Sequence, residues 1–211
     1  MDHWSGKKFV VATGNRGKLR EIRALTDGLG IEVVPQSEFA VPEVDETACT
    51  FVENAILKAR QAARYSGLPA LADDSGLEVD FLQGAPGVRS ARYGGSGAGD
   101  QANNDKLLQA LEGVPEARRG ARFRCVMVFL RHPEDPSPLI GQGVWEGRIL
   151  SRSRGSGGFG YDPVFWVPEL GCSVAELSPV DKNRLSHRGL ALQSLFGQLL
   201  DMAVPCGEKG G

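Results

Sequence analysis

Two adjacent carboxylates, Asp73 and Asp74, stand in the stretch "GLPALADDSGLEVDFL", residues 67–82, between a short apolar run and an alternating apolar pattern. Ser75 and Gly76 follow them, so the pattern predicts a turn that leaves the carboxylates at the end of a strand. Hard oxygen ligands of this kind suit Mg²⁺, which commonly bridges carboxylates to substrate phosphates. The alternative is that one acid only closes a turn through its own side chain.

More acids and a lysine surround this pair in the sequence. Glu43, Asp45 and Glu46 lie in an irregular acidic segment, which is either a second source of metal ligands or a solvated loop. Lys58 shares one face of a predicted helix with Asn54, and that helix leads directly into the acidic strand. Lysines in the middle of a helix are mostly surface groups, but this position keeps Lys58 among the candidates.

The loop "TGNRGK", residues 13–18, follows the first predicted strand and precedes a helix. Backbone N–H groups and the helix dipole favour an anion at such a place, and Lys18 adds a full positive charge. The loop is not a Walker A motif, because Ala12 stands where that motif needs glycine and Leu19 where it needs Ser or Thr. The alternative is a capped strand–helix turn without a ligand.

Two later stretches have the composition of a binding site. The glycines of "GSGGFGYDP" let the backbone approach a ligand, while Phe159 and Tyr161 offer stacking faces. A flexible loop with two buried aromatic rings is the simpler alternative. The stretch "DKNRLSHRG" gathers four basic side chains near a helix start, where a solvated basic face is the usual outcome. These side chains are Lys182, Arg184, His187 and Arg188.

Alternating strands and helices connect these stretches. Strands are predicted at "KKFVVATG", "IEVVP", "ARFRCVMVFL", "PLIGQGVWEGRIL" and "PVFWVP". Helices are predicted at "NRGKLREIRALTDGLG", "TFVENAILKARQAARYSGLP", "DQANNDKLLQALEG" and "SPVDKNRLSHRGLALQSLFGQLLDM", the last with a second start at Ser186. Thr50 and Glu53 form a predicted capping box, and Gly67 ends that helix. The order indicates an α/β protein with a mixed sheet and an antiparallel meander in its middle.

Composition limits the class of protein. The chain has 211 residues, of which 41% are hydrophobic and 24% charged, so we expect one unit over 1–211 with a core at about 8–201 and loose tails at 1–6 and 204–211. A net charge of −2 argues against a nucleic-acid or membrane partner. The four cysteines form no CxxC pair, and the sequence shows neither a signal peptide nor a membrane span. We therefore expect a cytoplasmic protein with free thiols.

Taken together, the four chemical stretches describe a nucleotide site, since triphosphate, metal and base each have a candidate. Six motifs, in order, resemble the pyrophosphatases of non-standard purine nucleoside triphosphates, the inosine/xanthosine triphosphatase family. They are "TGNRGK", "FVENAILKA", "ADDSGL", "GAPGVRSARY", "GGFGYDPVF" and "LSHRG", and the similarity runs from about Phe9 to Leu199. The resemblance implies an elongated mixed sheet with flanking helices and two lobes around a cleft. It also implies a homodimer that hydrolyses dITP, ITP and XTP with Mg²⁺ to the monophosphate and pyrophosphate.

The resemblance also assigns roles to residues. Asp74 is the expected general base and a metal ligand, and Lys58 a catalytic phosphate contact. Glu46 is the expected metal ligand of the acidic segment, whereas Asp73 has either a metal-side or a structural role. The remaining expected residues bind substrate through the triphosphate loop, the strand after the acids and the base pocket. They are Thr13, Gly14, Asn15, Arg16, Gly17, Lys18, Ser75, Phe159, Gly160, Tyr161, Asp162, Lys182, His187 and Arg188.

Two other functions remain open at this point. A Maf-like pyrophosphatase has a similar architecture and acts on other modified nucleotides, although "SHRG" and "GGFGYDP" favour the purine family. A nucleotide-sensing module binds the triphosphate without hydrolysing it, but a pure binder needs no carboxylate to activate water. Release of pyrophosphate with Mg²⁺ distinguishes an enzyme from a sensor.

Overall fold

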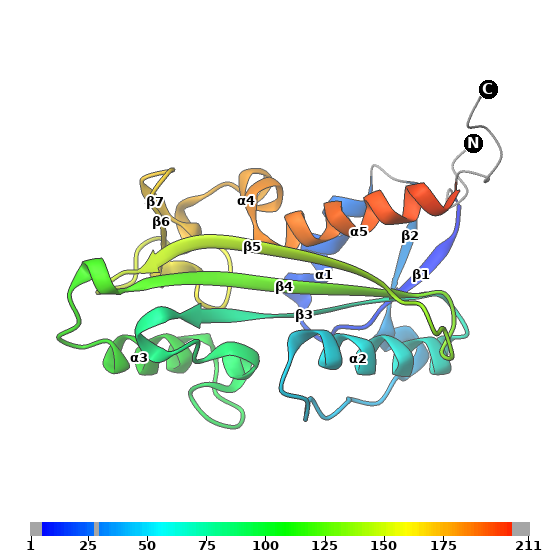
Figure 1. The fold of residues 1–211 in the computed structure, drawn as a ribbon, viewed down its shortest axis with the longest axis horizontal. Coiled ribbons are helices and arrows are strands. Elements are labelled where there is room, and N and C mark those ends of the chain that lie inside the picture. The colour runs from blue at the N-terminus through cyan, green and yellow to red at the C-terminus, as the bar shows by residue number, and fades with distance from the viewer. Residues whose placement is uncertain (1–5, 28–29, 204–211) are drawn as a thin grey trace. The chain divides into compact units, whose positions relative to one another are not determined.

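The computed structural model describes residues 6–27 and 30–203, in which strands and helices follow one another along the chain (Figure 1). The strands are β1 (Lys8–Val11), β2 (Glu32–Pro35), β3 (Ala70–Val79), β4 (Gly120–Leu130), β5 (Leu139–Ile149), β6 (Phe165–Val167) and β7 (Cys172–Ser173). The helices are α1 (Arg16–Thr26), α2 (Phe51–Ser66), α3 (Asp100–Ala110), α4 (Pro179–Leu185) and α5 (His187–Ala203). Apart from Gly6, the predicted tails lie outside the described residues.

The strands form one mixed sheet in the order β2-β1-β3-β4-β5-β6-β7. Strand β1 pairs in parallel with β2 and β3, whereas β5, β6 and β7 pair antiparallel. The predicted α/β class with a mixed sheet is therefore confirmed. By its internal contacts the chain divides into two compact units. Unit 1 consists of Met1–Asp74, Val126–Gly143 and Arg188–Gly211, and unit 2 of Ser75–Cys125 and Val144–His187.

Helix α2 covers one face of the sheet in unit 1, and α1 and α5 lie on the other face (Figure 1). The α2 interior is rich in alanine, and its small side chains pack against Ala70 and Ala72 of β3 in one apolar cluster. The predicted helix ends are confirmed, because the Thr50 hydroxyl accepts a hydrogen bond from the Glu53 amide and Gly67 closes the helix at φ +69°. Glycine adopts this left-handed conformation without the strain that other residues incur.

Strand β3 corrects one prediction, because it runs unbroken from Ala70 to Val79 and the turn predicted at Ser75 and Gly76 is wrong. The physical reason lies in the neighbouring strands. The pairing of β1 with β3 ends at Leu71 of β3. Strand β4 borders β3 on its other side, where β3 continues in extended form through both acids. The acids thus lie in the middle of β3, just beyond the point where β1 gives way to the loop at 13–18.

The buried apolar cluster of unit 2 is richer in aromatic rings than the alanine cluster beside α2. Leu107 and Leu111 of α3 pack with Leu77 and Val79 of β3, as the helical spacing of the leucines predicts. The rest of this buried cluster comes from β4, β5, β6 and the segments next to them, and includes Phe123, Trp145, Tyr161 and Phe165. The predicted second helix start is also confirmed, since α4 ends at Leu185 and α5 begins at His187.

Two expectations about the chain as a whole concern membranes and thiols. Within residues 6–27 and 30–203, no helix is long and apolar enough to cross a bilayer. Cys49, Cys125 and Cys172 are free thiols, and Cys206 lies outside the described residues.

Candidate active site

The paired acids of β3 point to opposite faces of the sheet, because side chains alternate along a strand. Asp74 shares the face of Ala70 and Ala72 and meets α2, whereas Asp73 meets Lys18 of α1 and Arg188 of α5. Figure 1 shows α2 on one side of β3 and the other two helices on the opposite side. Asp73 and Asp74 therefore contact two different groups of side chains, one on each face of the sheet.

Asp74 belongs to a group that joins three segments of unit 1. The Lys58 ammonium lies 2.9 Å from Asp74 Oδ1 and 3.0 Å from Glu46 Oε1, so it connects the strand acid with the acidic segment. The side-chain NH₂ of Asn54 donates to Asp74 Oδ2 at 3.3 Å, and the side-chain oxygen of Asn54 accepts the backbone amide of Ala48 at 3.1 Å. Asn54 and Lys58 thus hold both oxygens of one carboxylate from the same helix face.

The environment of Asp74 makes it a stronger base than an exposed aspartate. Burial raises the pKa of the Asp74 carboxyl, and this effect outweighs the opposing charges of Lys58 and Lys18. The balance at Lys58 is different. Burial lowers the pKa of its ammonium, but the charges of Asp74, Asp73 and Glu46 together raise that pKa by a larger amount. The pKa of Lys58 therefore lies above its usual value. Lys58 therefore remains a cation beside a carboxylate that accepts protons readily.

Asp73 is the centre of a buried ion cluster on the other face. Its Oδ2 lies 3.0 Å from Lys18 Nζ and 3.2 Å from Arg188 Nη2, and Arg188 also pairs with Glu21 through Nη1. Burial alone raises the pKa of Asp73, but the cations of Lys18 and Arg188 hold that pKa well below its usual range. The Arg188 side chain is only 2% exposed. This cluster fixes Lys18 and joins α1, β3 and α5.

The loop at 13–18 is a well-formed helix start. Asn15 is the N-cap of α1, and its side-chain oxygen accepts the amides of Gly17 at 2.8 Å and Lys18 at 3.1 Å. Residues 14–16 are exposed, and the Lys18 ammonium is directed to Asp73. A cavity of about 460 Å³ extends along the helix from Arg16, and two more arginines line it. The lining residues are Arg16, Leu19, Arg20, Arg23, Ala24 and Asp27.

In unit 2 the glycine–aromatic loop and the basic cluster meet at Asp162. Asp162 Oδ2 accepts the Phe159 amide at 2.9 Å and the Lys182 ammonium at 2.6 Å. The Lys182 Nζ also lies 4.3 Å from the centre of the Phe159 ring, within cation–π range. Phe159 and Lys182, one predicted residue from each motif, are thus brought together around one buried carboxylate.

Two further rings of unit 2 are fixed in place. The Tyr161 hydroxyl donates to the Ser90 carbonyl at 2.9 Å, and burial raises the pKa of this hydroxyl well above its usual value. The His187 ring stacks on Phe123 with 4.8 Å between ring centres and 16° between planes. Its neighbour Arg188 belongs to the ion cluster of unit 1, so adjacent residues of one motif have separate surroundings.

Several residues that hold these groups were not among the predicted site residues. Asn54 and Glu21 contact Asp74 and Arg188, while Asp100, Asn104 and Ser90 contact the glycine–aromatic loop. Asn54 carried a signal, its spacing from Lys58. The pair Asn103-Asn104 carried another, since asparagine is a poor helix former in a helix interior. Of the predicted basic cluster, Arg184 stands apart with a side chain that is 71% exposed.

The acids offer a partial site for a metal ion. In the part of the chain that the structure describes, no group of three His, Cys, Asp or Glu side chains is arranged around a common centre for a metal. Glu46 and Asp74 nevertheless converge on one cation, the Lys58 ammonium. Two hard oxygen donors of this kind fit Mg²⁺, which keeps several waters and takes substrate phosphate oxygens as further ligands.

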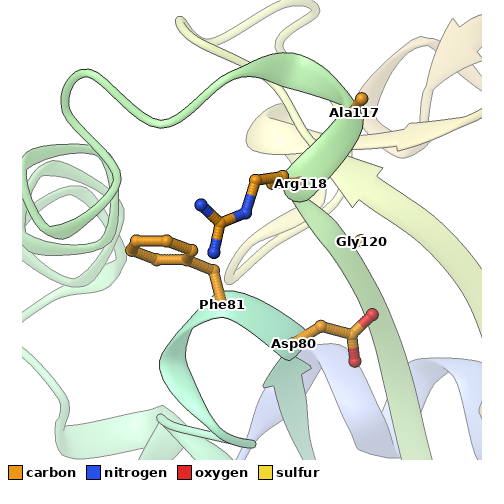
Figure 2. Close-up of a pocket in the computed structure, with 5 residues that line it drawn as sticks. All are labelled: Asp80, Phe81, Ala117, Arg118 and Gly120. Carbon is orange, nitrogen blue, oxygen red and sulfur yellow. The ribbon is translucent and has the colours of Figure 1, made fainter.

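A pocket of about 290 Å³ in unit 2 involves none of the predicted site residues (Figure 2). Its lining consists of Asp80, Phe81, Ala117, Arg118 and Gly120. The Arg118 guanidinium lies 4.9 Å from the centre of the Phe81 ring, and Asp80 pairs with Arg122 at 2.8 Å. The polar groups of this pocket thus have partners within unit 2.

The comparisons of this chain with known proteins agree on one family. The model of the Ham1 family matches residues 9–198. The chain is 63% identical to a dITP/XTP pyrophosphatase of Vibrio parahaemolyticus, over 92% of this chain and 96% of the relative. A solved HAM1 protein of Coxiella burnetii has a TM-score of 0.85 at 50% identity, and covers 92% of this chain and 99% of its own. A solved nucleoside-triphosphatase / dITP/XTP pyrophosphatase of Mycobacterium abscessus has a TM-score of 0.72 at 39% identity, over 91% and 99%. The expected resemblance is confirmed, and the chain belongs to the Ham1 family.

Proposed function

We propose that this protein is a pyrophosphatase that hydrolyses dITP, ITP and XTP to the nucleoside monophosphate and pyrophosphate. One observation carries the proposal: Asp74 is a buried carboxylate of raised pKa that Lys58 and Asn54 hold in a fixed orientation. A carboxylate arranged in this way is suited to take a proton from water. The relatives that carry the name dITP/XTP pyrophosphatase supply the substrate class.

In the proposed reaction, Asp74 orients a water molecule and accepts its proton. The water oxygen forms a new bond to phosphorus while the bond between the α- and β-phosphates breaks, and pyrophosphate leaves. Lys58 keeps its charge because three nearby acids raise its pKa, so it stabilises the negative charge that develops on the phosphate. The proton, the bond formed and the bond broken are thereby accounted for.

The resemblance implies Mg²⁺, and Glu46 and Asp74 are the residues that we assign to hold it. The chemistry that Mg²⁺ supplies when bound is neutralisation of phosphate charge and a lower pKa for a coordinated water. Asp73 takes the structural role in this proposal, because its Oδ2 pairs with both Lys18 and Arg188 and so ties α1 and α5 to β3. Its function is to fix Lys18 behind the loop at 13–18, whose exposed residues contact the triphosphate.

The base is recognised by the unit 2 groups. Hypoxanthine and xanthine carry a 6-keto oxygen, an acceptor, where adenine carries an amino donor. Lys182 and His187 donate to this oxygen, while Phe159 and Tyr161 supply ring faces. Ser75, which follows Asp74 in the sequence, also contacts the substrate. An adenine presents its amino donor to these donors where the keto oxygen presents an acceptor, which lowers its affinity. Guanine shares the keto group, so rejection of GTP depends on the shape of the pocket near the glycine–aromatic loop.

Three finer assignments complete the proposal. The resemblance implies a homodimer, the scattered cysteines and the sequence without a signal peptide or membrane span favour the cytoplasm, and the length and composition favour one domain. The last assignment is supported by β3, β4 and β5, each of which contributes residues to both units. Light scattering during size-exclusion chromatography measures the mass of the assembly, and a single mass of one chain contradicts the dimer.

The test of the function is a nucleotide panel. Purified protein with Mg²⁺ is incubated with dITP, ITP, XTP, GTP and ATP, and monophosphate and pyrophosphate are measured. We expect release of both products from the first three and little from the last two. Equal turnover of all five refutes the selectivity, release of single phosphate refutes the cleavage position, and binding without product indicates a sensing module.

A further inference from the structure

Helix α3 holds the glycine–aromatic loop of unit 2 at both backbone polar groups of one residue, Gly160. The Gly160 amide donates to Asp100 Oδ2 at 2.7 Å, and the Gly160 carbonyl accepts the Asn104 side-chain amide at 3.0 Å. Asp100 and Asn104 are four residues apart and therefore lie on the same face of the helix. Gly160 is the residue between Phe159 and Tyr161, so this two-point contact fixes the backbone that carries both rings.

Gly160 has φ +62°, in the left-handed region that glycine adopts without strain. Within the loop, the Asp162 carboxylate accepts the Phe159 amide, and the Asp162 amide donates to the Phe159 carbonyl at 3.3 Å. These bonds close the turn around Gly160, whose own amide and carbonyl are held from outside by α3.

The Asn104 side chain lowers the free energy of unfolding, so its presence indicates a role other than stability. Its side chain is 3% exposed, and its Oδ1 is buried with no hydrogen-bond partner in the described part of the chain. A buried polar atom without a partner destabilises the fold, and an apolar side chain at this position avoids that penalty. The contact with Gly160 is the benefit that asparagine provides here.

The same helix also holds the segment that receives Tyr161. Asn103 accepts the Gly94 amide at 2.6 Å and donates to the Ala91 carbonyl at 3.3 Å, next to the Ser90 carbonyl that accepts the Tyr161 hydroxyl. Asn103 and Asn104 are equally buried, at 3% each, but only Asn104 contacts the loop. The two adjacent asparagines thus form a natural pair for comparison.

We propose that Asp100 and Asn104 are positioning residues that set base selectivity by fixing Gly160 between the two aromatic rings. This inference rests on the proposed function. Neither residue is a proton donor or acceptor in the reaction, so their loss weakens and broadens base recognition while bond cleavage continues at its usual rate.

The experiment compares Asn104→Leu and Asp100→Ala with their neighbours on the same helix. Asp105→Ala, which loses a contact with Gln101, is the matched control for the exposed site. Asn103→Ala shows the effect of losing a buried asparagine that binds the segment at 91–94 in place of Gly160. We expect the first two to raise KM for ITP about five- to tenfold and to lower the ITP/GTP ratio of kcat/KM similarly, with kcat within about twofold. Asp100→Asn keeps an acceptor oxygen and is expected to restore most of the selectivity.

Amide hydrogen exchange at Gly160 gives a readout that needs no turnover. We expect faster exchange at this amide in Asp100→Ala and unchanged exchange in Asp105→Ala. Equal protection in all variants overturns the contact itself. Faster exchange with unchanged KM and selectivity overturns the positioning role while leaving the proposed function intact.

If the unmodified protein releases no pyrophosphate from ITP, the proposed function fails and this inference fails with it. Thermal unfolding of each variant identifies any that does not fold, and Asp100→Ala, at an exposed position, then decides the result.

Discussion

The two units of the chain contribute different kinds of groups. In unit 1 the candidate residues are charged side chains on regular elements, with Asp73 and Asp74 on β3 and their cationic partners on α1, α2 and α5. In unit 2 they are ring faces and backbone groups of a loop, held by Asp162 and α3. Charged groups on rigid elements suit phosphate binding and proton transfer, whereas a supported loop suits discrimination between bases. The comparison predicts that changes in unit 1 alter rate or stability and that changes in unit 2 alter selectivity.

The largest expected effect is that of Asp74→Asn. The amide keeps the shape of the side chain but cannot accept the proton of water. We expect kcat for ITP to fall about a thousandfold or more, as for the loss of a general base. ITP binding and the free energy of unfolding are expected to change little. Calorimetry and pyrophosphate release measure these quantities, and near-normal kcat contradicts the assignment of the base.

The next effect is on stability, from Arg188→Met. Methionine keeps part of the volume but leaves Asp73 and Glu21 buried without the guanidinium that pairs with both. We expect the free energy of unfolding to fall by about 3–5 kcal/mol, as for a broken buried ion pair. Arg184→Met is the control, because that arginine is largely exposed and its loss is expected to cost under about 0.5 kcal/mol. Similar urea midpoints for the two variants contradict the role of the ion cluster.

A smaller effect is expected from His187→Phe in unit 2. Phenylalanine preserves stacking on Phe123 but removes the ring N–H donors. We expect the ITP/ATP ratio of kcat/KM to fall about tenfold, which corresponds to the loss of one strong hydrogen bond, with kcat for ITP almost unchanged. The ratio is measured from initial rates with each nucleotide. An unchanged ratio removes His187 from base recognition.

The smallest effect concerns an ion pair of unit 1 outside the candidate groups. Asp135 accepts hydrogen bonds from Arg131 and from the Ser137 amide, and the Arg131 guanidinium lowers the pKa of Asp135 well below its usual range. A lowered pKa in the fold stabilises the protein at neutral pH, and this stabilisation is lost as the pH falls below about 4. We expect Asp135→Asn to lower Tm by about 3 °C at pH 7, less at pH 3, with unchanged activity. A Tm difference that grows on acidification contradicts the sign.

Much of the fold follows from local patterns in the sequence. Helix α2 begins at Thr50 and ends at Gly67 as its capping residues predict, and the second helix start after Ser186 is also correct. The unbroken course of β3 was not predictable, because Ser75 and Gly76 are typical of turns, and the neighbouring strand β4 that favours the extended form is distant in the sequence. Local preference was overridden there by a neighbour that is distant in the sequence.

The site was predictable in its motifs and not in its contacts. The motifs contain Asp74 and Lys58, whereas Glu46 was a choice among the acids of a segment outside the motifs; the structure brings all three together. Nothing in the sequence indicated that Asp73 and Asp74 face different helices, because that follows from the strand continuing through them. The contacts of Asp100 and Asn104 with Gly160 depend on segments about sixty residues apart, so no spacing rule reveals them.

The central claim is that one carboxylate of unit 1 performs the chemistry while unit 2 selects the base. The most direct test measures kcat/KM for ITP and ATP in Asp74→Asn and in His187→Phe, side by side with the unmodified protein. The account predicts that Asp74→Asn lowers both values by the same large factor and leaves their ratio unchanged, whereas His187→Phe changes the ratio and spares kcat for ITP. A changed ratio in Asp74→Asn, or a large loss of kcat in His187→Phe with its ratio intact, contradicts the claim.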